Sequence, residues 1–67
     1  MSAMSEEIVT VTVELTPAQA WQLAQFLKRS SWEQYRQNAT SDAEARLMID
    51  ACHRLMYALA EKGYAPR

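Results

Sequence analysis

The chain has 67 residues and a formal charge of −1, from 7 Lys plus Arg against 8 Asp plus Glu, with one Cys and one His. A single cysteine excludes an intramolecular disulfide framework and a multi-cysteine zinc site, and a single histidine excludes a His-rich metal cluster. The length allows one small domain, residues 1–67, with flexible tails expected at 1–7 and 65–67.

The charge and hydropathy pattern also limits the setting of the protein. No apolar stretch approaches the roughly 18 residues of a membrane span, and the N-terminus is polar and acidic, unlike a signal peptide. We therefore expect a cytoplasmic protein without membrane contact. The near-neutral charge disfavours nucleic acid as a partner, because phosphate backbones attract a basic face.

Residues 8–15 alternate in character, and this pattern predicts a β-strand. One face carries Val9, Val11, Val13 and Leu15, and the other carries Ile8, Thr10, Thr12 and Glu14. The strand is expected to be half-buried, with the valine face on the core.

A helix is predicted to begin after Thr16, because Pro17 suits the first helical position and Gln19 completes a capping box. Its apolar face continues through Ala20, Leu23, Ala24 and Leu27. We expect one long helix that runs to about residue 38. Two further possible capping boxes, Ser30 with Glu33 and Ser31 with Gln34, make a kink near Ser30 and Ser31 the alternative.

The second predicted helix begins at Ser41, where Glu44 completes another capping box. One stripe at helical spacing forms its expected core face: Ala45, Met48, Ile49, Cys52, Leu55, Met56 and Leu59. Gly63 is expected to end the helix, with Tyr64 folding back on Leu59. The predicted fold class is therefore α+β and mostly helical, with one strand followed by two antiparallel helices.

A lone strand leaves two unpaired edges, which recruit another strand. We expect two copies of residues 8–15 to pair antiparallel in a homodimer, since isologous dimers are the commonest oligomers. The alternative is pairing with the sheet edge of a different protein.

One flank of the first predicted helix is the candidate partner-binding site. It carries Trp21, Lys28, Trp32 and Arg36, and Trp and Arg are typical interface anchors. The alternative is that both indoles are buried against the second helix or a partner subunit, which the small size of the chain favours.

No catalytic pair or cofactor site is predicted. Cys52 and His53 are adjacent on a helix and point about 100° apart, so they do not form a nucleophile and base. The alternating row of Asp42, Arg46, Asp50 and Arg54 is typical of a solvated helix face.

The strand 8–15, the helix start at Thr16-Pro17 and the second start at Ser41 together resemble the ribbon-helix-helix repressors. This resemblance covers about residues 8–60 and implies a dimeric DNA-binding regulator. The first helix is longer than that family's, the turn lacks Gly, and the ribbon lacks Lys and Arg. These departures weigh against DNA binding.

The segments VTVELTPAQAWQLAQFLKR and ALAEKGYAP also resemble a family of short uncharacterised proteins from prophages and mobile elements of proteobacteria. This setting implies regulators or inhibitors of host machinery. The expected function is a non-enzymatic protein-binding module, one form of which is an anti-CRISPR-like inhibitor of a host defence complex. The alternative is a ribbon-helix-helix-like DNA-binding regulator.

Overall fold

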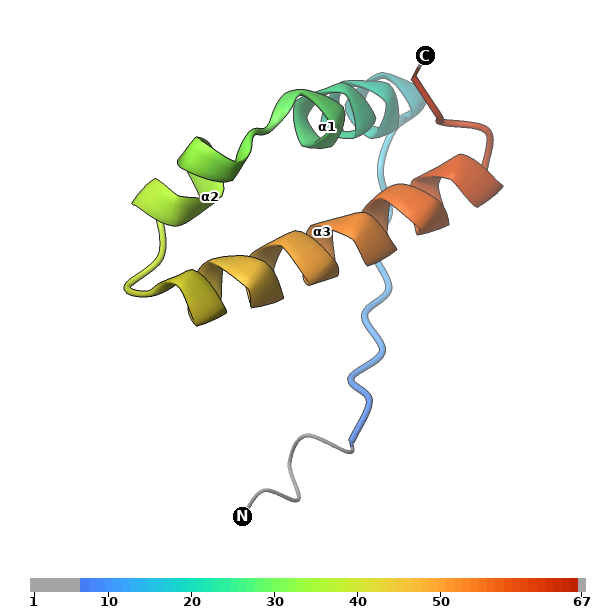
Figure 1. The fold of residues 1–67 in the computed structure, drawn as a ribbon. Helices are drawn as coiled ribbons and strands as arrows, with labels where there is room; N and C mark the ends of the chain where they lie inside the picture. Colours follow the sequence, from blue (N-terminus) through green and yellow to red (C-terminus); the bar gives the residue numbers. More distant parts are fainter. Residues whose placement is uncertain (1–6, 67) are drawn as a thin grey trace.

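The computed structural model describes residues 7–66, and these residues fold into a helical hairpin with an extended N-terminal arm. Helix α1 spans Pro17–Arg29, the short α2 spans Trp32–Gln37, and α3 spans Asp42–Glu61. Figure 1 shows α1 and α2 along one side of the hairpin and the longer α3 along the other. Both α1 and α2 contact α3.

The predicted start of the first helix is confirmed. The Thr16 hydroxyl accepts a hydrogen bond from the Gln19 backbone N–H at 3.1 Å, and the Gln19 side chain accepts one from the Thr16 N–H at 3.0 Å. These reciprocal bonds satisfy two of the backbone donors that a helix start leaves unpaired.

The prediction of one long helix to residue 38 is wrong, because the chain breaks at Ser30 and Ser31. Both serines are extended, and the Ser30 N–H and hydroxyl both bond to the Phe26 carbonyl, which closes α1. Ser31 then caps α2 through a complete box with Gln34. Local side-chain bonds to the backbone thus replace the helical bonds that a continuous helix would need.

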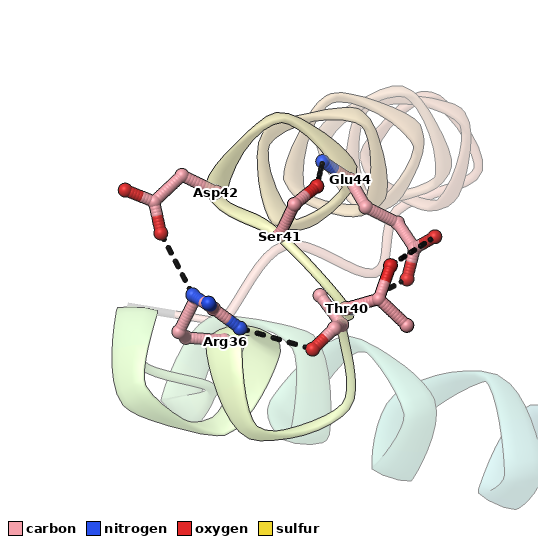
Figure 2. Close-up of polar contacts among 6 residues, drawn as sticks. Arg36, Thr40, Ser41, Asp42 and Glu44 are labelled. Atoms are coloured by element: carbon pink, nitrogen blue, oxygen red, sulfur yellow. Dashed lines mark hydrogen bonds and ion pairs between the residues drawn. The ribbon is translucent and has the colours of Figure 1, made fainter.

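The turn between α2 and α3 is held by polar contacts (Figure 2). Arg36 donates from Nε to Asp42 Oδ1 at 2.7 Å and from Nη1 to the Ala39 carbonyl at 3.0 Å. Ser41 caps α3 by accepting from the Glu44 N–H, as predicted. The Glu44 carboxylate accepts from Thr40 rather than from Ser41. In a complete capping box the Glu44 side chain would accept from the N–H of the N-cap residue, Ser41. Here it accepts from the N–H of Thr40, one residue earlier.

The end of α3 follows the expected glycine motif. Gly63 has a φ of +98°, its N–H bonds to the Ala60 carbonyl, and the Tyr64 N–H bonds to the Leu59 carbonyl at 2.9 Å. This pattern reverses the chain after the helix. It brings the Tyr64 side chain back onto the hydrophobic core.

The core of the described residues is small and rich in alanine. Its buried members are Ala20, Ala24, Leu27, Ala45 and Leu59. The predicted stripe of α3 is buried or half-buried with one exception, since Leu55 remains 39% exposed. The Leu55 side chain lies at the edge of the packed face and not inside it.

The predicted α+β fold class is wrong for residues 7–66, because these residues form helices and no strand. Residues 7–15 are extended but lack a second strand to pair with, and a strand requires hydrogen bonds from a neighbour. Val9, Val11 and Val13 are 82%, 74% and 63% exposed, so the expected valine face is not buried. The strand pairing across a homodimer is accordingly withdrawn.

Of the expected flexible tails, only Glu7, Ala65 and Pro66 belong to the described residues, so the flexibility of the tails stays a prediction.

None of the helices within residues 7–66 is both long enough and apolar enough to cross a bilayer.

Candidate protein-binding site

A groove lies between α1 and the C-terminal part of α3, and we refer to it as the tyrosine groove. Its volume is about 160 Å³, and its lining combines apolar side chains, two phenols and one amine: Ala24, Lys28, Met56, Tyr57, Ala60, Tyr64, Ala65 and Pro66. Tyr57 is 73% exposed at its rim. The groove therefore offers an aromatic and cationic surface that solvent reaches.

The chain reversal at Gly63 builds one wall of the tyrosine groove. Tyr64 returns across the end of α3, and its ring lies 6.1 Å from the Trp21 ring, centroid to centroid, at an interplanar angle of 59°. This tilted arrangement is a favourable geometry for two aromatic rings. The contact joins the N-terminal half of α1 to the segment after α3.

The structure separates the four predicted binding residues into two pairs. Lys28 lines the tyrosine groove and Trp21 supports its wall from α1, whereas Trp32 and Arg36 lie on α2, beyond the break at residues 30–31. The predicted continuous flank assumed one helix, and the break interrupts the 3.6-residue period on which it depended. Binding by these four residues remains a prediction.

Trp21 and Trp32 are 38% and 43% exposed, so neither indole is fully buried. Arg36 is engaged in the turn with Asp42 and Ala39, which gives it a structural role in the folded chain. Of the four predicted residues, Lys28 therefore lines the tyrosine groove, and Trp21 contacts the Tyr64 ring that forms part of its wall.

Tyr57, Tyr64 and Pro66 were not predicted as site residues. Tyr57 and Ala60 are three positions apart on α3, which places them on neighbouring positions of the helix surface. For these two residues the spacing was a usable signal. The contribution of Tyr64 depends on the reversal at Gly63, and the contribution of Lys28 depends on the packing of α1 against α3.

A separate polar contact joins α2 to α3. Burial, reinforced by hydrogen bonding to the Cys52 thiol, raises the pKa of Tyr35, while a hydrogen bond from Ser30 acts in the opposite direction. Cys52 is half-buried and packs against the core, as expected for a cysteine in the apolar stripe. Tyr35 on α2 thus lies near Cys52 on α3, outside the tyrosine groove.

Acidic, histidine and cysteine side chains do not gather in threes anywhere in residues 7–66.

The model of a family of unknown function, DUF7706, matches residues 1–67, the whole chain. The chain belongs to this family. No curated protein and no solved structure matches the chain significantly. Membership agrees with the expectation of a short uncharacterised family and assigns no chemistry to the tyrosine groove.

Proposed function

We propose that this DUF7706 protein is a non-enzymatic protein-binding module that holds a segment of a larger protein in the tyrosine groove. The observation that carries the proposal is the lining of that groove, where the exposed Tyr57 and Lys28 and the half-buried Tyr64 lie beside apolar side chains. Tyrosine contributes large contact area and a hydrogen-bonding hydroxyl at low entropic cost, which is why it is enriched at interfaces.

The groove favours a partner segment of particular chemistry. A volume of about 160 Å³ receives one or two side chains, not a folded surface. Its apolar lining residues Ala24, Met56 and Ala60 suit an apolar side chain, and the Lys28 ammonium suits a carboxylate beside it. The best-fitting ligand is therefore an apolar residue next to an acidic one.

The finer proposal is that the partner belongs to a host complex that a mobile element must inhibit. Its support is the resemblance of the segments quoted above to prophage proteins. The DNA-binding alternative depended on a two-stranded ribbon. Because residues 7–15 form no strand, the structure provides no observation that favours this alternative, and DNA binding stays an untested prediction.

The test is affinity capture from the native host, followed by titration of the captured protein against matched variants. Tyr57→Ala and Lys28→Glu are expected to weaken binding about tenfold or more, whereas Lys28→Arg and the distant Arg46→Ala leave it within about twofold. Melting curves confirm that each variant folds. Equal binding by all variants would exclude the tyrosine groove as the site.

A further inference from the structure

A hollow lies between the extended N-terminal arm and the C-terminal half of α3, and we refer to it as the arm hollow. Its volume is about 360 Å³, and Figure 1 shows the arm passing α3 at this end. The arm hollow separates two parts of the same chain. Its apolar lining comes from the arm and from α3: Val11, Val13, Leu15, Leu55, Ala58 and Leu59.

Both walls of the arm hollow leave apolar side chains open to solvent. Val11 and Val13 are exposed on the arm, and Leu55 and Ala58 are exposed on α3. Leu59 is the one buried residue of this apolar lining, and it belongs to the core that packs on α1. Water between two apolar walls is unfavourable, so contact between the walls is favoured.

Polar contacts do not hold the arm away from α3. Among residues 7–66, the hydrogen bonds and the ion pair all lie at Thr16 or beyond, so none joins residues 7–15 to a helix. Thr16 itself is fixed as the N-cap of α1 by its reciprocal bonds with Gln19. The arm therefore has a fixed end at Thr16 and can approach α3 without breaking a hydrogen bond.

We propose that residues 11–15 form a strap that closes onto α3. In the closed position, Val11 and Val13 lie against Leu55 and Ala58. The apolar residues of the strap alternate along an extended segment, so their side chains share one face and a single movement brings them to the helix. An apolar cavity of about 150 Å³ holds a benzene molecule. The arm hollow is larger and has room for both valine side chains.

Charge also favours the closed strap. Lys62 lines the arm hollow at the C-cap of α3, and Glu14 lies between two lining residues of the arm. Closure brings the carboxylate nearer to the ammonium group, and opposite charges attract. The aliphatic stem of Lys62 adds apolar surface for the arm to cover.

The closed strap covers an apolar surface that its opening would expose. When the strap is closed, the valines of the arm and the apolar face of α3 shield each other from water. When it is open, both surfaces are available for other contacts. The strap is separate from the proposed function, because the arm hollow and the tyrosine groove share no lining residue.

Two matched substitutions in the full chain test the strap. Val13→Thr places a hydroxyl in the closed hollow at nearly unchanged shape, and we expect it to lower the melting temperature by about 4–8 °C. Val9→Thr makes the same change on the same face of the arm, at a residue that does not line the hollow, and should leave the melting temperature nearly unchanged. Circular dichroism should show equal helix content in both variants. Equal melting shifts overturn the proposal.

Methyl NOE spectroscopy of the wild type tests the closed position directly. Cross-peaks are expected from the methyl groups of Val11 and Val13 to those of Leu55 and Ala58, and none are expected from Val9. Isotope filtering of mixed labelled and unlabelled chains should remove these cross-peaks, because the contact lies within one chain. Cross-peaks that persist after filtering would assign the contact to a second copy, and their absence from the wild type would mean that the arm stays open. Either result overturns the proposal, and neither bears on the binding test at the tyrosine groove.

Discussion

Arg36 and Asp42 form an ion pair across the turn between α2 and α3, with Nε and Oδ1 separated by 2.7 Å. The two side chains are 41% and 66% exposed, so water screens their attraction. The same guanidinium also donates to the Ala39 carbonyl. The contact therefore orders the turn while adding little to the free energy of unfolding.

A double-mutant cycle should measure this small contribution. Arg36→Gln and Asp42→Asn, alone and combined, are expected to show a coupling energy below about 1 kcal/mol in urea denaturation. The coupling should shrink further in high salt. A coupling of several kcal/mol would show that the pair is shielded from water in solution.

The small core predicts strong sensitivity at its largest members. Leu59 is 7% exposed and packs from α3 against α1, so Leu59→Ala should destabilise the chain by about 2–5 kcal/mol. Arg46→Ala, on the exposed side of α3, should cost well under about 1 kcal/mol. Thermal melts of both variants make the comparison, and similar shifts would mean that α3 packs through a different face.

Gly63 should tolerate a side chain sterically but not conformationally. A Cβ at this position meets no atom within 4 Å, yet φ is +98°, which other residues rarely adopt. Gly63→Ala should therefore cost about 1 kcal/mol through the backbone alone. It should also loosen the Trp21–Tyr64 contact, which tryptophan fluorescence and near-UV circular dichroism report. Unchanged stability would mean that the reversal does not depend on this conformation.

Alkaline pH should weaken the attachment of α2 to α3. The pKa of Tyr35 is raised in the folded chain, mainly by burial, so the native state favours the neutral phenol. The resulting stabilisation is fully present below the unfolded pKa near 10 and is lost as pH rises through the folded pKa. Tyr35→Phe should therefore lose less stability than the wild type between pH 9 and about 11. Tyr57→Phe, at a 73% exposed side chain, is the control. Equal pH dependence in all three proteins would contradict this role for Tyr35.

The helix starts could be predicted from the sequence because their contacts are local. Thr16 and Gln19 lie three residues apart, as do Ser31 and Gln34, so each capping box is complete within four residues. The end of α3 at Gly63 was predictable for the same reason, because its hydrogen bonds join residues that are close in sequence. The break at residues 30–31 was visible as competing capping signals, but the choice between a break and a kink depends on how α2 packs against α3.

The strand and the burial of Leu55 could not be predicted because they depend on neighbours. Alternation in residues 8–15 indicates an extended conformation, and the arm is extended, but pairing needs a second strand that residues 7–66 do not supply. The stripe of α3 is wider than one partner helix can cover, so its edge at Leu55 stays open. The tyrosine groove likewise joins Lys28 to Tyr64 across the fold, a pairing that spacing along one helix does not reveal.

The alanine-rich core would link the abundance of this protein to the abundance of the partner proposed above. Ala24 and Ala45 are 2% and 0% exposed, but methyl groups bury little area, so the isolated chain keeps only a narrow margin against unfolding. A ligand present at a hundredfold excess over its dissociation constant adds about 2.7 kcal/mol. Unoccupied copies would visit the unfolded state far more often and be degraded first. The cell would thereby retain the protein in proportion to its bound fraction.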